Sequence, residues 1–189
     1  MINYDQEIYE GAIQGGATPA LAKLMIAQGR FESGNYGNNQ TKTNNNVFGF
    51  KYSPNSQYAK KGNISPEGDP YAKYDTLQDA ILDYIGRWMN KSSKEGGTRL
   101  QEFNKIQEGD TYTYAYKLKK SYGYYGTLQG ESDEDAINRY AKGMKSALTR
   151  MKIVEFYFKN QTTINYAVIG GVLIGMTAYV YYLVKKKII

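Results

Sequence analysis

The sequence predicts an α+β domain that is mainly α-helical, followed by one membrane-spanning helix near the C-terminus. Three observations lead to this prediction. Apolar residues recur at helical spacing in several segments, a stretch rich in turn residues favours a small β-hairpin, and residues 164–184 carry no charge. At 189 residues the chain is long enough for one domain and an appendage, and too short for two full domains.

The first predicted helix begins after Thr18, a residue type that caps helix N-termini, and Pro19 suits the first helical position. The helical pattern continues to about residues 33–34. Four residues spaced four, three and four apart lie on one face of this helix: Leu21, Met25, Gln28 and Glu32. A carboxylate at Glu32 therefore ends an otherwise largely apolar stripe.

A turn-rich stretch separates the first helix from the next helical segment. Residues 35–46 are rich in Asn, which favours turns, and the sequence VFGFKYS comes directly after them. From there to Tyr74 we expect a loop or a short hairpin. Most of any β-structure should lie in this region.

The second half of the domain is predicted to be helical. Thr76 caps an amphipathic segment whose apolar face, Trp88 included, is interpreted as core. Shorter helices are expected over residues 98–106 and 111–121. Ser132 begins a pattern that resembles a capping box and opens the last helix of the domain. The inward-facing residues of that last helix are expected to be Ile137, Tyr140, Ala141, Met144 and Leu148.

Residues 164–184 are predicted to form a transmembrane helix. At a rise of about 1.5 Å per residue, this uncharged segment would span roughly the 30 Å hydrocarbon core of a bilayer. The three lysines at residues 185–187 account for half of the formal net charge of +6. Basic residues also precede the segment, so the side of the membrane on which the domain lies stays open.

The expected organisation has four parts: a domain over residues 1–151, a connector over 152–163, the membrane helix over 164–184 and a basic tail over 185–189. Gly171 and Gly175 form a GxxxG pair that would let two membrane helices approach as a homo-oligomer. The N-terminal residues lack the apolar stretch of a cleavable secretory signal. Because residues 164–184 are predicted to span a membrane, the lipid bilayer is the expected partner of the C-terminal segment.

The chain contains no Cys and no His, which excludes several kinds of chemistry. Thiol nucleophiles, Ser-His-Asp triads, disulfides and the common zinc sites all need a thiolate or an imidazole. No metal and no cofactor is expected, and hydrolysis would rest on carboxylates. Nucleic-acid binding is not expected, because the mild positive charge forms no clustered basic face.

Glu32 is the carboxylate best suited to catalysis. Glycoside hydrolysis needs a carboxylic acid that keeps its proton near neutral pH. Burial on an apolar helix face disfavours the anion, and so does the negative end of the helix dipole. Both effects predict a raised pKa for Glu32.

Four sequence blocks around this glutamate occur in a recognisable order. They are AQGRFESGNYG at residues 27–37, NNNVFGFK at 44–51, YAKYDTLQDAILDY at 71–84 and YKLKKSYGYYG at 116–126. Together they resemble the glucosaminidase family, glycoside hydrolase family 73, whose pattern contains ES-G, N-FG-K, KYD and GY. The resemblance covers about residues 18–150.

The resemblance implies a lysozyme-like fold that cleaves the glycan of peptidoglycan as an endo-β-N-acetylglucosaminidase. Glu32 stands at the position of the family's general acid. The residues that would border the substrate groove are Asn46, Phe48, Gly49, Lys51 and Tyr124.

The second catalytic carboxylate is less well defined by the sequence. The family often carries an acidic residue in a β-hairpin after the FG-K block, and Glu67 is the best positional candidate, followed by Asp69. Both lie among Pro and Gly, where acidic residues are common in turns. Alternatively, the acetamido group of the substrate or a distantly held water completes the reaction.

Two other functions remain open from the sequence. A lytic transglycosylase uses one glutamate and leaves an anhydro product, and a non-catalytic wall-binding or structural membrane protein of a phage virion would need none. A wall-degrading domain on a membrane anchor without a secretion signal suggests a phage protein in the internal membrane of a virion. A bacterial envelope protein is the alternative.

Overall fold

The computed structural model describes residues 3–151, which are mainly helical and contain one two-stranded sheet. This composition fits the predicted α+β class. The chain divides into a compact unit of Met1–Leu148 and a second unit of Thr149–Ile189. Within residues 3–151 no helix is both long and apolar enough to cross a bilayer. The predicted membrane helix at 164–184 lies outside the described residues.

The N-terminal half contains the helix that ends at Glu32. Helix α1 (Tyr4–Gln14) packs against α2 (Pro19–Glu32), and α2 contributes many residues to the core. The side chain of Thr18 caps α2 by accepting a hydrogen bond from the backbone N–H of Leu21 at 3.3 Å. Both ends of α2 are therefore where the sequence predicts them.

The turn-rich stretch contains a short helix that the sequence did not predict. Helix α3 (Asn39–Asn44) is Asn- and Thr-rich, so its intrinsic helix propensity is low. The Asn38 side chain caps it by accepting from the N–H of Thr41 at 2.9 Å, and it packs on the hairpin that follows. A local cap and tertiary contacts therefore override the weak propensity.

The predicted hairpin is present and forms the only sheet within residues 3–151. Strands β1 (Lys60–Ile64) and β2 (Pro70–Lys73) pair in antiparallel fashion, with a register irregularity near the end of β1. The turn over residues 65–69 joins them and is mostly exposed. Tyr74 follows β2 and is buried in the core.

The second half is helical, as predicted. Its elements are α4 (Leu77–Asp83), the π-helical turn η1 (Tyr84–Met89), α5 (Arg99–Phe103), α6 (Thr111–Tyr116), η2 (Lys117–Ser121) and a helix over residues 133–151. Thr76 and Thr98 form capping boxes, and Ser132 exchanges hydrogen bonds with Asp135 in the same way. Trp88 is the exception, because it is only half-buried and is not a core residue.

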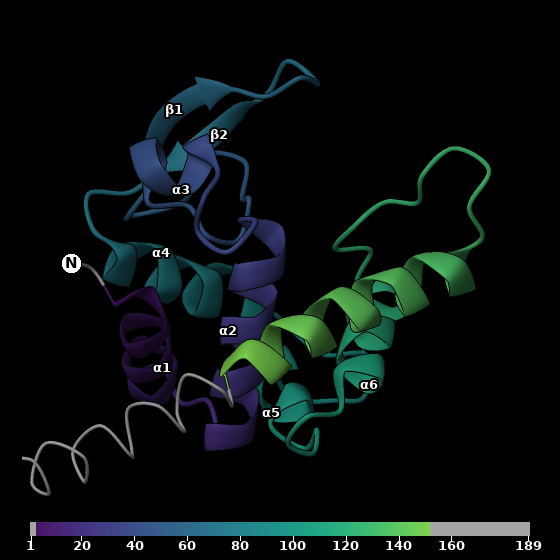
Figure 1. The fold of residues 1–189 in the computed structure, drawn as a ribbon. Coiled ribbons are helices and arrows are strands. Elements are labelled where there is room, and N and C mark those ends of the chain that lie inside the picture. The colour runs from purple at the N-terminus through teal and green to yellow at the C-terminus, as the bar shows by residue number, and fades with distance from the viewer. Residues whose placement is uncertain (1–2, 152–189) are drawn as a thin grey trace, which may run out of the picture. The chain divides into compact units, whose positions relative to one another are not determined.

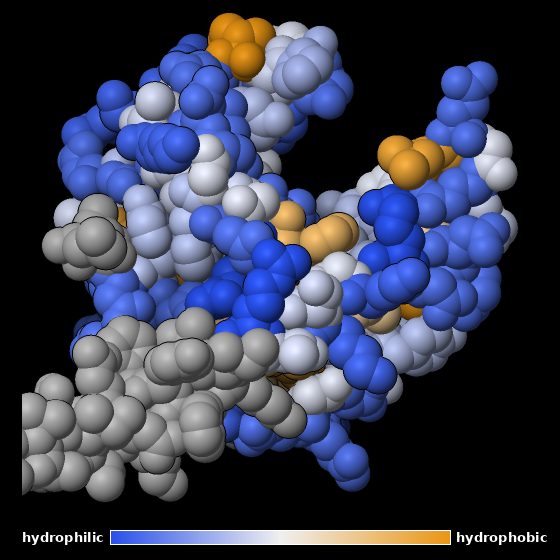
Figure 2. Space-filling model, viewed as in Figure 1, coloured by the Kyte–Doolittle hydropathy of each residue, from blue (hydrophilic) through white to orange (hydrophobic). Residues whose placement is uncertain are grey.

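The end of α2 lies at a hollow in the surface. In Figure 1 the hairpin and α3 lie on one side, α6 and the helix that begins at residue 133 lie on the other, and α2 rises between them. Figure 2 shows that the surface is hollowed between the hairpin and the loop that precedes residue 133. Helix α2, which ends at Glu32, lies between the two parts of the fold that border this hollow.

Candidate active site

Glu32 sits half-buried at the C-terminal end of α2, and one of its oxygens has a defined partner. The hydroxyl of Tyr140 donates a hydrogen bond to Oε1 of Glu32. Tyr140 is itself buried, stacks on Tyr125 with ring centroids 4.1 Å apart, and meets the edge of Phe31. The packed rings fix the hydroxyl that contacts the carboxyl group.

Burial raises the pKa of Glu32 above the ordinary value for glutamic acid. The hydrogen bond from Tyr140 and the positive charge of Arg139 act in the opposite direction, and burial outweighs both. Glu32 therefore keeps its proton to a higher pH than an exposed glutamate does. This is the property that a general acid needs.

A buried tyrosine cluster lies next to Glu32. Gln28, one helical turn earlier on α2, accepts hydrogen bonds at Oε1 from the hydroxyls of Tyr84 and Tyr114, at 3.0 and 2.6 Å. Burial raises the pKa of both tyrosines, and the nearby charge of Glu32 adds to it.

The turn after Glu32 has an uncommon backbone conformation. Gly34, Asn35 and Tyr36 have φ values of 59°, 57° and 64°, a left-handed run that favours glycine and asparagine. The Ser33 hydroxyl accepts from the N–H of Tyr36 at 2.7 Å and closes the turn. The residues that follow Glu32 in the ESGNYG sequence therefore form this turn, which is a structural role separate from that of the carboxylate.

Helix α1 holds this turn from the other side. Asp5 forms an ion pair with Arg30 of α2 and accepts a hydrogen bond from the Tyr36 hydroxyl at 2.7 Å. Tyr4 stacks on the Tyr36 ring with centroids 4.6 Å apart. These contacts stabilise a tyrosine in the left-handed region, which otherwise costs about 1–2 kcal/mol.

Two of the predicted groove residues lie beneath the surface. The Asn46 amide donates to the carbonyls of Phe50 and Ala72 at 2.8 and 2.9 Å and accepts from the Phe50 N–H at 3.0 Å. Asn46 and Phe48 are 1% and 3% exposed, and Phe48 stacks on Tyr84. Their burial favours a supporting role behind the groove wall over contact with substrate.

The other predicted groove residues reach the surface. Gly49 is exposed with φ 65°, and Lys51 and Tyr124 are half-buried. The Tyr124 hydroxyl donates to the carbonyl of Phe48 at 2.8 Å, which joins the GY block to the N-FG-K block. After burial, the charge of Glu32 is the next largest cause of the raised pKa of Tyr124. The structure therefore brings Tyr124 near Glu32.

Glu67 lies in the turn of the β-hairpin and is exposed. Lys51 donates a hydrogen bond from Nζ to its Oε2 at 2.7 Å and is the largest cause of the lowered pKa of Glu67. Glu67 therefore remains ionised through the neutral range. Asp69 is exposed in the same turn, where its backbone carbonyl accepts from Ser65 at 2.8 Å.

The sequence did not predict the surroundings of Glu32. Tyr140 was expected only on an inward helix face, yet it is the direct partner of Glu32 although 108 residues separate the two. Tyr84 and Tyr114 likewise reach Gln28 from distant segments. No local pattern identifies such contacts, because each depends on how separate helices pack.

In a chain without Cys and His, a glutamic acid with a raised pKa has the property that the acid of a carboxylate-dependent glycosidase needs. The chain belongs to the glucosaminidase family: the family model described as mannosyl-glycoprotein endo-β-N-acetylglucosaminidase matches residues 13–167. The match confirms the predicted family and the predicted enzyme class, a glycoside hydrolase of the β-N-acetylglucosaminidase type. The family also supports peptidoglycan as the substrate.

Among solved structures, the chain is similar to the catalytic domain of the autolysin Auto from Listeria monocytogenes. The TM-score is 0.47 and the sequence identity 19%, and the match covers 82% of this chain and 89% of the other. No curated protein matches the sequence.

Proposed function

We propose that this protein hydrolyses the glycan strand of peptidoglycan as an endo-β-N-acetylglucosaminidase, with Glu32 as the general acid. The observation that carries the proposal is the raised pKa of Glu32, which ends helix α2 and accepts a hydrogen bond from Tyr140, in a member of the glucosaminidase family. The reaction opens the bacterial cell wall locally or lyses it.

In the proposed reaction Glu32 donates its proton to the glycosidic oxygen as the bond between that oxygen and the anomeric carbon breaks. Positive charge develops on the anomeric carbon, and water finally adds its hydroxyl group there. The remaining proton of that water returns to the enzyme. The hydroxyl of Tyr140 stabilises the Glu32 anion that the transfer leaves behind.

Glu67 is proposed as the second carboxylate. It is ionised, it lies in the hairpin turn, and Lys51 holds it in place. An ionised carboxylate can activate the attacking water or stabilise the positive charge at the anomeric carbon. Gly49 and Tyr124 are proposed to border the substrate, with Asn46 and Phe48 supporting the wall behind them.

The test is digestion of purified peptidoglycan by the full-length chain, followed by mass spectrometry of the products. Reducing-end N-acetylglucosamine is the expected product. Anhydromuramyl ends would instead identify a lytic transglycosylase. Absence of any soluble product would identify a non-catalytic wall-binding protein.

We also propose that residues 164–184 anchor the protein in a bilayer, because this segment is apolar, uncharged and of spanning length. The protein should then resist extraction from membranes by alkaline carbonate. A place in the internal membrane of a phage virion predicts its presence in purified particles. Its detection only in uninfected bacterial envelopes would contradict the virion proposal. Gly171 and Gly175 are proposed to pair two such helices.

A further inference from the structure

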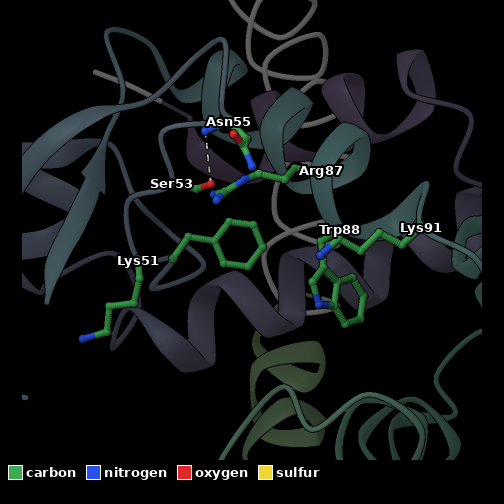
Figure 3. A pocket seen from close by; sticks show the side chains of 7 residues that line it. Lys51, Ser53, Asn55, Arg87, Trp88 and Lys91 are labelled. Carbon is green, nitrogen blue, oxygen red and sulfur yellow. Dashed lines mark hydrogen bonds between the residues drawn. The ribbon is translucent and has the colours of Figure 1, made fainter.

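A pocket of about 340 Å³ opens beside the hairpin, and basic and aromatic side chains dominate its lining. Lys51, Arg87 and Lys91 supply three positive charges, Phe50 and Trp88 supply two rings, and no carboxylate lines it. In Figure 3 Arg87 points toward the loop that carries Ser53, and Lys91 extends toward Trp88. Such a lining suits a ligand that is both flat or apolar and negatively charged.

Arg87 is a fixed part of this pocket. Its Nη2 donates to the buried carboxylate of Asp83 at 2.7 Å, and its guanidinium lies 5.2 Å from the centre of the Phe50 ring. Asp83 also accepts from the Tyr74 hydroxyl at 2.7 Å and is enclosed in the core. The pair fixes Arg87 at the pocket wall, and Asp83 itself is not part of the lining.

The two lysines differ in how much of their charge is available. Lys51 pairs with Glu67, whereas Lys91 is exposed and pairs with no carboxylate among the residues that the structure describes. An anion that enters the pocket would therefore meet one uncompensated ammonium group and a fixed guanidinium.

Side chains that line the pocket also pack on residues near Glu32. Trp88 packs on Tyr124 with ring centroids 5.2 Å apart, and Phe50 stacks on Tyr84 at 5.3 Å. The hydroxyl of Tyr84 bonds to Gln28, one helical turn before Glu32. Trp88 and Tyr124 are both partly exposed and Tyr124 lies near Glu32, so we infer that a glycan with one sugar beside Glu32 extends a neighbouring unit past Tyr124 toward the pocket.

We propose that this pocket binds an anionic substituent of muramic acid on a sugar next to the cleaved bond. This inference rests on the proposed function. In peptidoglycan every second sugar is a muramic acid, whose lactyl group carries a peptide with free carboxylates and which can also carry wall polymers with phosphodiesters. The rings contact the sugar or the apolar part of the substituent, and Arg87 and Lys91 pair with its charge.

The test compares Lys91→Glu with Lys105→Glu in the full-length chain. Both substitutions replace a lysine by a glutamate, so they change the net charge equally. Lys105 is also exposed and pairs with no carboxylate in residues 3–151, but it lies outside the pocket. Binding is measured by depletion from solution onto intact walls, walls freed of phosphodiester polymers by hydrofluoric acid, and neutral chitin. Depletion onto walls needs no turnover, so it can succeed even where the proposed hydrolysis fails.

Lys91→Glu should bind intact walls about fivefold more weakly than Lys105→Glu, with a smaller difference on chitin. A difference that persists on acid-treated walls assigns the anion to a carboxylate, and one that disappears there assigns it to a phosphodiester. Either result supports the proposal. Two results would overturn the proposal. One is equal binding of the two variants to intact walls. The other is a loss of affinity in Lys91→Glu, relative to Lys105→Glu, that is as large on neutral chitin as on intact walls.

Discussion

Glu32 and Glu67 carry the same chemical group, but the surroundings of their carboxyl groups differ in each respect that sets a pKa. Glu32 ends a 14-residue helix, is half-buried and contacts the hydroxyl of Tyr140. Glu67 lies in an exposed turn and pairs with the ammonium of Lys51. Burial raises the pKa of Glu32, whereas the hydrogen bond from Lys51 lowers that of Glu67.

This difference teaches how the surroundings of two glutamates in one chain suit them to the two roles proposed for them. A local ion pair between the hairpin turn and Lys51, the last residue of the N-FG-K block, keeps Glu67 ionised. The proton on Glu32 depends instead on burial, which outweighs the opposing hydrogen bond from Tyr140 on a distant helix. Pairs of carboxyl groups whose pKa values are pushed apart are how glycosidases separate an acid from a base or nucleophile.

The largest expected effect comes from Glu32→Gln. The amide keeps the shape of the side chain but cannot donate a proton, so activity on peptidoglycan should fall by about 10²- to 10⁴-fold. Thermal unfolding should remain close to that of the parent chain. Glu10→Gln, an exposed position on α1, is the control and should keep full activity. Retained turnover in Glu32→Gln would exclude it as the acid.

Glu67→Gln should have the next largest effect. Loss of the second carboxylate should lower turnover by about 100-fold. Asp69→Asn is the matched control, because it removes a charge from the same exposed turn. Rates are compared on the same peptidoglycan preparation. If both variants turn over at the parent rate, the reaction uses the acetamido group of the substrate or a distant water instead.

Tyr140→Phe should have a smaller effect and should move the pH profile. The lost hydrogen bond stabilises the Glu32 anion, so its removal raises the pKa of Glu32 further. A general acid is inactive once it has lost its proton, so the alkaline limb of kcat/KM should shift to higher pH. Turnover should fall about fivefold as the carboxyl group loses its partner.

Tyr125→Phe is the control for that shift. Its hydroxyl donates to the carbonyl of Ala115 at 3.0 Å rather than to Glu32. Its alkaline limb should therefore stay where that of the parent enzyme lies. An unmoved limb in Tyr140→Phe, or the same shift in both variants, would contradict the role given to Tyr140.

The smallest expected effect on activity comes from Asp5→Asn, which loosens the turn after Glu32. The change weakens the contacts of Asp5 with Arg30 and Tyr36, so the free energy of unfolding should fall by about 1–2 kcal/mol. Turnover should fall only about twofold. Glu7→Gln on the same helix should be nearly neutral in urea unfolding. Equal stability of the two variants would show that α1 does not hold the turn.

Much of the fold could be predicted because its signals are local. Thr18, Thr76, Thr98 and Ser132 cap helices within three residues of themselves, and each helix begins where the cap predicts. The α3 helix was missed because its stability depends on the hairpin rather than on its own residues. Trp88 was assigned to the core because helical periodicity gives the face of a residue, not how completely other segments cover it.

The candidate site was predicted in part. Glu32 was recognisable from its place on an apolar helix face, and the four ordered blocks added Tyr124. Tyr140 lay on a correctly predicted face, but its hydrogen bond to Glu32 depends on the crossing of two helices far apart in the chain. The burial of Asn46 could not be predicted either, since its partners include the β2 residue Ala72.

The most direct test of the proposed acid is the pKa of Glu32 itself, measured by NMR of the glutamate side-chain carboxyl carbons in the full-length chain. One resonance, absent from Glu32→Gln, should titrate above the usual glutamate value of about 4.3. It should move to still higher pH in Tyr140→Phe. If the resonance that disappears in Glu32→Gln titrates together with those of exposed glutamates, Glu32 does not hold the proton that the proposed hydrolysis requires.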